Sequence, residues 1–472
     1  MATPEEVRAR LAPPLPQHVL AGWLAPLGVT LFAFAIRLHR LRFPTKEVFD
    51  ETYYRKDAYS LLKHGVEIGE NGAASFVVHP PFGKWLIALG EGLGSYDSFG
   101  WRISAAIAGA LSILVLCRLG RRLFRSTLLG CLAGFLLSLD GLHFVQSRIA
   151  MLDIFLLLWV VAALACLVAD RDDMRAKLAA RLDRDLSYPG PKLGFRWWRL
   201  AAGVCLGAAI ATKWSAIFYV VALVLLSLAW DVGARRTAGI PAPFRAAIWR
   251  ELIPIGLLLL AVPFALYVFS WAGWFLTDDG FARDQGALRG FISYHRQILD
   301  FHSGLDTPHP YQSNPWGWLL LARPVSYWYT APIKDTSEEI LGIGTPAIWW
   351  ASIPALFAVM WSWISRRDWR AAAILIGFAA GYLPWLFQPD RTMFLFYALP
   401  AVPFLCLALA YCAGLVIGPS DGSVTRRRVG GAVVAAYTLL VVVNFFGLYP
   451  ILAAEVIPYS SWHDRMWFTT WI

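Results

Sequence analysis

Long apolar stretches alternate with short polar segments along almost the whole chain. A bilayer core of about 30 Å is crossed by about 20 mostly apolar residues in a helix. Eleven stretches approach this length, and they predict about eleven transmembrane helices. The predicted spans are residues 21–39, 98–117, 127–145, 149–169, 199–212, 215–230, 252–274, 345–364, 371–387, 391–416 and 430–450. Around Lys213 and Trp214, one long hairpin is the alternative to two separate spans.

The segments between the spans predict the orientation in the membrane. Those on one face are short and hold most of the Lys and Arg residues, which is typical of the cytoplasmic side. Two segments on the other face are large, residues 41–97 and 275–344, and we expect them to carry short interfacial helices. The chain then divides into a cytoplasmic tail (1–20) without a signal-peptide pattern, a transmembrane domain (21–450) and an outer C-terminal tail (451–472).

The composition agrees with a polytopic, all-α membrane protein. Hydrophobic residues make up 58% of the chain and charged residues 16%, whereas soluble proteins have about 45–50% and about 25%. Soluble, disordered and disulfide-rich classes are therefore excluded. The net charge of +10 is explained by the inner loops and requires no nucleic acid partner. All six cysteines fall within predicted spans, so no disulfide framework is expected.

Two adjacent carboxylates, Asp50 and Glu51, follow the first predicted span by a few residues. Their side chains point in different directions in a helix or a strand, which suits two different roles. Partial desolvation near lipid raises the proton affinity of a carboxylate and makes it a better base for a hydroxyl group. The alternative is an acidic pair at a helix start, stabilised by the helix dipole.

Four cations stand near the outer ends of predicted spans, where the orientation rule disfavours them: Arg102, Arg148, Lys213 and Arg391. Together they would fit one anionic ligand with a lipid tail, because guanidinium groups match phosphate oxygens. His79 and Lys84 are further candidates, although a Lys beside a Trp is also a common interface anchor. The alternative for each cation is snorkelling, or pairing with a local acid such as Asp140 or Asp153.

The second large outer segment contains histidines at 295, 302 and 309, with prolines at 308 and 310 that interrupt a helix. No compact set of three or four metal ligands is present, so no metal site is predicted. Exposed aromatic residues beside Asn, Gln and His are typical of a site that stacks on sugar or peptide, and also of a segment that lies flat on the membrane.

Several motifs together resemble the protein O-mannosyltransferase family in its actinobacterial form, over nearly the whole chain. They are Phe49-Asp50-Glu51, Lys56-Asp57-Ala58, His79-Pro80-Pro81-Phe82-Gly83-Lys84-Trp85, Ser147-Arg148-Ile149-Ala150-Met151-Leu152-Asp153, Ala211-Thr212-Lys213-Trp214-Ser215, and His309-Pro310-Tyr311 with Arg323-Pro324-Val325. The resemblance implies a GT-C membrane glycosyltransferase. It would move mannose from polyprenyl-phosphate mannose to Ser or Thr of exported proteins, with inversion. Residues 275–344 are too few for the β-trefoil domain of eukaryotic members.

The resemblance also implies residue roles. Asp50 would be the catalytic base and Glu51 would orient acceptor or donor. Donor phosphate would be bound by Arg102, Arg148, Lys213, Arg391, Lys84 and His79, and acceptor or sugar by Tyr53, Tyr54, His302, His309 and Trp316. No cofactor and no divalent metal are expected. The implied location is the outer face of the cytoplasmic membrane, and the implied partners are the lipid-linked donor, secreted acceptor proteins and the protein export channel.

Two alternatives remain. One is a GT-C transferase that uses another lipid-linked sugar with a lipid or glycan acceptor. The other is a secondary transporter, although transporters place charged residues near the bilayer midplane rather than at the ends of spans.

Overall fold

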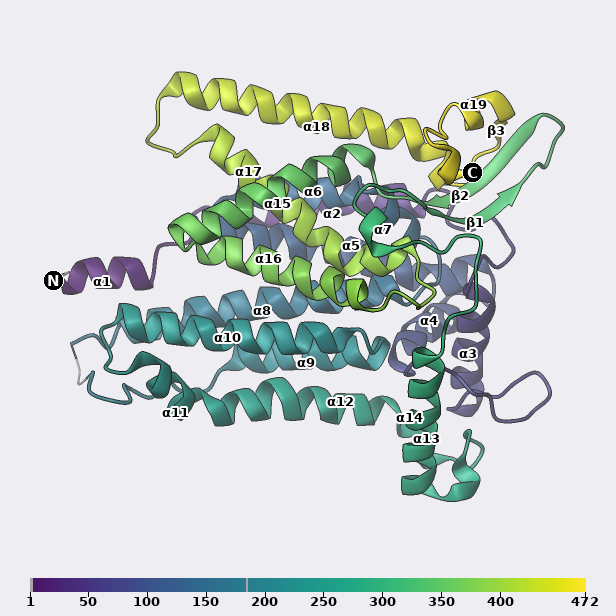
Figure 1. Ribbon diagram of the computed structural model, residues 1–472, viewed down its shortest axis with the longest axis horizontal. Helices are drawn as coiled ribbons and strands as arrows, with labels where there is room; N and C mark the ends of the chain where they lie inside the picture. The colour runs from purple at the N-terminus through teal and green to yellow at the C-terminus, as the bar shows by residue number, and fades with distance from the viewer. Residues whose placement is uncertain (1–2, 184–185) are drawn as a thin grey trace.

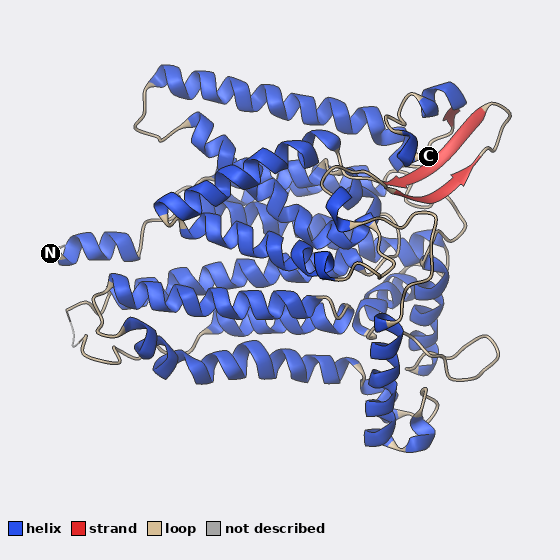
Figure 2. Cartoon of the chain, in the orientation of Figure 1, coloured by secondary structure: helices blue, strands red, loops and turns tan. Residues whose placement is uncertain are grey.

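The computed structural model describes residues 3–183 and 186–472. Residues 1–2 of the predicted tail and 184–185 of an inner segment lie outside the described part. The chain is a bundle of long helices with a small sheet at one corner, as Figure 2 shows. All six cysteines are free thiols.

Within the described part, nine helical segments are long and apolar enough to cross a membrane. They are α2 (Ala21–Leu38), α5 (Ser98–Phe124), α8 (Asp153–Ala179), α10 (Ala216–Thr237), α11 to α12 (Pro243–Ser270), α15 (Pro346–Arg366), α16 with η4 (Trp369–Phe387), η5 with α17 (Leu395–Ile417) and α18 (Val424–Leu452). Two shorter apolar helices, α6 (Thr127–Ser138) and α9 (Trp197–Thr212), lie among them. The helices α9 and α10 are separate helices, joined by a turn at residues 213–215.

The predicted span 127–145 is also wrong as one helix, because it divides at Leu139 and Asp140 into α6 and α7 (Gly141–Gln146). The Asp140 side chain caps α7 by accepting a hydrogen bond from the backbone N–H of His143. Its other oxygen accepts from Trp349 Nε1 at 2.7 Å. This N-cap starts a new helix at Gly141 and so interrupts the single helix that the apolar residues alone would predict.

The large extramembrane elements gather at one end of the bundle (Figure 1). They are α3 (Glu51–His64), α4 (Phe82–Leu93), α13 (Ala272–Leu276), α14 (Ala287–Ser303), the sheet strands and α19 (Tyr459–His463). The short helix α1 (Pro4–Leu11) lies at the opposite end, with the short loops. The two large segments that the sequence placed on one face therefore do lie together.

A three-stranded antiparallel sheet is the main feature that the sequence did not reveal. β1 (Val325–Thr330) pairs with β2 (Thr336–Gly342), and β2 pairs with the two-residue β3 (Ile457–Pro458) near the C-terminus. Trp462 Nε1 donates to Glu339 Oε2 at 2.6 Å beside this pairing. The predicted C-terminal tail is therefore packed against the second large outer segment.

Helix α8 lies at the centre of the bundle and α18 at its edge. In the most apolar part of each helix, 78% of α8 is buried inside the protein, against 17% of α18. α8 begins at Asp153, at the end of the bundle where the extramembrane elements lie. The first turn of the central helix is therefore next to these elements.

At the opposite end, many of the charges assigned to the inner loops are buried in ion pairs. Arg199, whose side chain is fully buried, contacts Asp231 at 2.6 Å and Glu251 at 3.0 Å. Arg196 and Arg235 join the same cluster through Asp231 and Glu251. These arginines tie α9, α10 and α11 together.

Candidate active site

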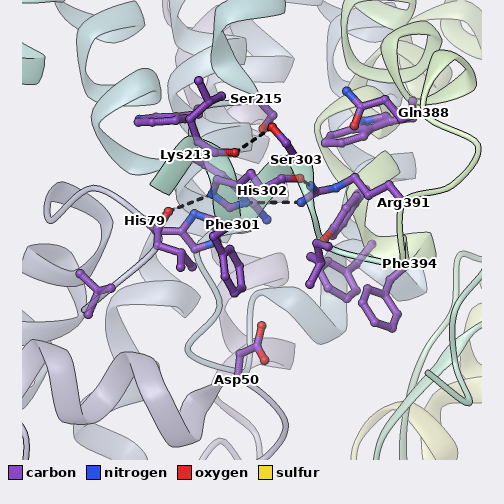
Figure 3. A pocket seen from close by; sticks show the side chains of 18 of the residues that line it. Asp50, His79, Lys213, Ser215, Phe301, His302, Ser303, Gln388, Arg391 and Phe394 are labelled. Carbon is purple, nitrogen blue, oxygen red and sulfur yellow. Dashed lines mark hydrogen bonds between the residues drawn. The ribbon is translucent and has the colours of Figure 1, made fainter. Parts of the chain in front are cut away.

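One cavity of about 1280 Å³ opens where the extramembrane elements meet the ends of the spans. Its walls come from α3, residues 75–84, the turn between α9 and α10, α14 with the segment after it, and residues 385–397. Segments far apart in sequence therefore share one cavity. In Figure 3, Asp50 stands on one side of it, apart from the group formed by His79, His302 and Arg391.

Nine of the thirteen predicted site residues line this cavity. They are Asp50, Tyr53, Tyr54, His79, Lys84, Lys213, His302, His309 and Arg391. Glu51, Arg102, Arg148 and Trp316 do not line it. Trp316 is instead 74% exposed on the surface.

Glu51 and Arg102 form an ion pair with both side chains 0% exposed. The two Arg102 contacts to the Glu51 carboxylate are 2.8 Å each. The same carboxylate accepts backbone N–H bonds from Val48 and Ala150, at 3.0 Å and 2.8 Å. Arg102 also donates to the Leu41, Pro44 and Lys46 carbonyls. Through these hydrogen bonds the pair fixes the loop before Asp50 to α5 and to the segment before α8, and neither side chain lines the cavity.

Arg148 is also held away from the cavity. Its guanidinium donates to the carbonyls of His39 and Arg40 at 2.9 and 3.2 Å, and lies 4.9 Å from the Phe144 ring centre. The predicted group of four phosphate-binding cations is therefore divided: Arg102 and Arg148 hold backbone, and Lys213 and Arg391 face the cavity.

Lys213 lies in the turn between α9 and α10 and pairs with Asp153, with Nζ to Oδ distances of 2.9 and 3.0 Å. The local-acid alternative is correct for this contact. Nζ also lies 5.0 Å from the Tyr397 ring centre, and Lys213 still lines the cavity. Asp153, at the start of the central helix, thus holds the ammonium group in place.

Arg391 donates from Nη1 to the carbonyl of His302, while its buried Nε has no partner among the described residues. His302 Nε2 donates to the Val78 carbonyl at 2.9 Å. Burial lowers the pKa of His302 to about 4 and lowers the pKa of His79 well below its usual range. Both imidazoles are therefore neutral near pH 7, and Lys213 and Arg391 supply the positive charge here.

Asp50 occupies the position before the first residue of α3. The preceding residue, Phe49, has a φ of +50°, a backbone conformation that non-glycine residues rarely adopt. Its ring packs edge-on against Tyr327, Phe394 and Phe396, with centroids 5.2 to 6.0 Å apart. This aromatic wall supports the strained residue and so directs the Asp50 carboxylate into the cavity.

Burial raises the pKa of Asp50 to about 6, with Asp153 adding to the rise and Lys213 opposing it. A carboxylate with this pKa is still ionised at neutral pH, yet binds a proton better than an ordinary Asp. Asp50 therefore has the chemistry of a general base in the lining of the cavity.

The cavity also has an apolar part of its lining, which sequence reasoning missed. It includes Ile217 and Phe218 of α10, Leu299 of α14, and Trp385 and Phe387 of η4. Phe387 is 82% exposed. The missed signal was the run of apolar residues that closely follows Lys213 and closely precedes Arg391.

Sequence reasoning also missed Asp57 as a candidate site residue. It lines the cavity seven positions after Asp50, on the same face of α3 as Tyr54. The motif Lys56-Asp57-Ala58 marked it, but without a role. Among the described residues, no group of three His, Cys, Asp or Glu side chains is arranged to hold a metal ion. Independence from metals stays a prediction.

Comparisons with known proteins agree with this architecture. Residues 28–101 and 97–274 match the family model for dolichyl-phosphate-mannose-protein mannosyltransferase, and residues 287–471 match the C-terminal four-transmembrane region of protein-O-mannosyltransferase. The chain belongs to the protein O-mannosyltransferase family. The prediction made from the sequence motifs is confirmed.

Two relatives are similar over nearly their whole length. The polyprenol-phosphate-mannose–protein mannosyltransferase of Mycolicibacterium smegmatis (strain MKD8) is 37% identical, over 95% of this chain and 93% of the relative. The protein of the same name from Mycobacterium tuberculosis (strain H37Rv) is 38% identical, over 97% and 93%.

The fold resembles a solved structure of the same family. The Saccharomyces cerevisiae protein O-mannosyltransferase Pmt1-Pmt2 complex bound to the sugar donor superimposes with a TM-score of 0.78, covering 99% of this chain and 94% of that chain at 16% identity. The prediction of a helical GT-C membrane glycosyltransferase is confirmed, with the sheet as an addition.

Proposed function

We propose that this protein O-mannosyltransferase transfers mannose from polyprenyl-phosphate mannose to Ser or Thr hydroxyls of exported proteins. One observation carries the proposal. The lining of a single cavity combines apolar side chains, the cations Lys213 and Arg391, and the carboxylate of Asp50, whose pKa is raised. A lipid-linked sugar phosphate presents matching kinds of chemical groups. The names of the two bacterial relatives agree with this donor.

The donor would lie with its polyprenyl chain against the apolar lining residues and its phosphate between Lys213 and Arg391. The sugar would then project toward Asp50. A polyprenyl phosphate is a good leaving group, so the site requires no general acid. Lys213 and Arg391 stabilise the charge that develops on the phosphate, and Asp50 removes the proton of the acceptor hydroxyl. Direct attack opposite the phosphate inverts the anomeric carbon, and no cofactor enters this reaction.

The membrane orientation follows from charge. The short loops rich in Lys and Arg lie at the end of the bundle opposite the cavity (Figure 1). The positive-inside rule places those loops and the N-terminus in the cytoplasm of a plasma membrane. The cavity then opens on the outer face, where exported chains emerge, and the export channel is a partner that would deliver them.

Incubation of membranes with radiolabelled polyprenyl-phosphate mannose and Ser/Thr-rich peptides tests this function. We expect label in the peptide, removable by an α-mannosidase, since inversion of a β-linked donor gives an α-mannoside. Label found only in lipid or polysaccharide would instead support the transferase that uses a non-protein acceptor. A matched peptide with Ala at every Ser and Thr is the control for the acceptor atom.

The pH dependence of transfer should show the ionisation of Asp50. Because the pKa of Asp50 is raised to about 6 and the ionised form is the base, kcat/KM should be flat above this pH. Below it, kcat/KM should fall about tenfold per pH unit as the carboxylate becomes protonated. Initial rates between pH 5 and 8 measure this. A rate that stays constant down to pH 5 would exclude Asp50 as the titrating base.

Arg391→Ala should weaken donor binding by about 1.5–3 kcal/mol, the usual contribution of a hydrogen bond to a charged group. The reason is that Arg391 lines the cavity without a carboxylate partner in an ion pair, unlike Lys84 and Lys213, and its Nε has no protein partner among the described residues. Titration of the purified protein with a fluorescent polyprenyl-phosphate mannose measures the change. Arg296→Ala, which changes an exposed arginine on α14, is the matched control. Equal affinity in both variants would remove Arg391 from the phosphate site.

A further inference from the structure

Two charged residues in the lining of the cavity have no role in the reaction described so far. Lys84 lies in the first turn of α4, and its side chain is 1% exposed. Asp57 lies on α3, and its side chain is 17% exposed. Both line the cavity with Asp50. Charged groups this deeply enclosed beside an open volume are expected to meet a polar ligand there.

The contacts of Lys84 exclude phosphate binding. Its Nζ forms a hydrogen bond and ion pair with Glu67, whose side chain is 6% exposed. Asp57 Oδ2 is also 3.4 Å from the same Nζ. Two carboxylates therefore surround one ammonium group, and the net local charge is negative. An anion is repelled here, in contrast to the centre of the cavity with Lys213 and Arg391.

Asp57 retains unused capacity to accept hydrogen bonds. A carboxylate offers about four acceptor positions, and the contact to Lys84 is at the long end of hydrogen-bond distance. Burial raises the pKa of Asp57, with Lys84 opposing the rise. Elsewhere in the lining of the cavity, the buried Nδ1 of His79 has no hydrogen-bond partner among the described residues. These atoms suit a neutral ligand that both donates and accepts.

The position of Asp57 fits the far side of a sugar. Seven residues along a helix correspond to about 10.5 Å, and Asp50 and Asp57 share one face of α3, with Tyr54 between them. A hexose whose anomeric carbon lies near the phosphate and Asp50 has its ring hydroxyls directed along this face. Hydroxyl groups both donate and accept, so they match a carboxylate next to an ammonium group.

We propose that Asp57 and Lys84 form a sugar subsite that binds ring hydroxyls of the donor and so selects which hexose is transferred. The inference rests on the proposed function. Glu67 acts through Lys84: by neutralising the ammonium group it leaves Asp57 as the acceptor for the sugar. A site that hydrogen-bonds a substrate hydroxyl discriminates strongly against analogues that lack it or direct it elsewhere.

The test compares four donors in the full-length protein: polyprenyl-phosphate mannose, its glucose epimer, and the 2-deoxy and 3-deoxy mannose analogues. Wild type should prefer mannose over at least one analogue by about tenfold or more in kcat/KM. Asp57→Asn should reduce that preference to within about twofold, because the variant and the analogue lose the same interaction. Asp390→Asn makes the same chemical change at an exposed position of the cavity rim and should keep the wild-type preference.

Two outcomes would overturn the subsite. In one, Asp57→Asn keeps the full preference of wild type, so the losses in kcat/KM caused by the substitution and by the analogue donor simply add. The other is a wild-type enzyme that uses all three other donors as well as mannose, which applies even if Asp57→Asn does not fold. Failure of the proposed function is distinct, because wild type would then transfer no mannose to peptide at all.

Discussion

Asp50→Asn is expected to lower kcat for mannose transfer by about 10²–10⁴-fold, the usual contribution of a positioned general base. The substitution keeps the size of the side chain and removes its ability to take a proton. It leaves the neighbouring ion pair of Glu51 intact, since Glu51 contacts Arg102 and two backbone N–H groups rather than Asp50. Initial rates with saturating peptide and lipid-linked mannose measure the effect.

Two controls make this result specific. Donor affinity should change little, because Lys213 and Arg391 still face the cavity. Asp278→Asn, which changes an exposed carboxylate outside the cavity, should keep the wild-type rate. A variant Asp50→Asn that retains more than about a tenth of the wild-type kcat would show that another group takes the proton.

The transmembrane architecture is predictable from the sequence because apolar stretches are a local property. Lipid satisfies no backbone polar group, so a long apolar segment must become a helix whatever its neighbours are. The exception shows the limit of this reasoning. The span 127–145 divides at Asp140, whose carboxylate caps α7 and accepts from Trp349, a residue far away in the sequence.

The sheet could not be predicted for a related reason. The pairing of β2 with Ile457 and Pro458 joins an outer segment to the C-terminal residues. A two-residue strand has no periodicity to recognise, and its pairing depends on the whole fold.

The sequence predicted most of the residues that line the candidate site, but it predicted only some of the contacts that these residues make. Sequence reasoning identified adjacent carboxylates and outer cations, because charges beside membrane spans are rare. It did not distinguish Arg102 from Arg391. The difference is tertiary: Arg102 meets Glu51 and three carbonyls, whereas Arg391 meets the cavity. Asp57 was missed because its importance depends on Lys84, which lies on a different helix.

Breaking the buried ion pair should affect folding more than donor binding. Arg102→Ala is expected to destabilise the protein by about 3–5 kcal/mol, because it leaves the Glu51 carboxylate buried without its counter-ion. Three carbonyls also lose their donor, those of Leu41, Pro44 and Lys46. Thermal unfolding of the purified protein in detergent, followed by tryptophan fluorescence, measures this loss.

The double variant Glu51→Gln with Arg102→Met separates the two roles of the pair. It removes both charges, and the introduced amide oxygen can replace one of the two carboxylate oxygens that accept from the backbone N–H groups of Val48 and Ala150, so only part of the stability should return. If Arg102 instead binds phosphate, Arg102→Ala would unfold at the wild-type temperature and bind the donor more weakly. A large drop in unfolding temperature with partial recovery in the double variant identifies a structural pair, whose function is to fix the loop that presents Asp50.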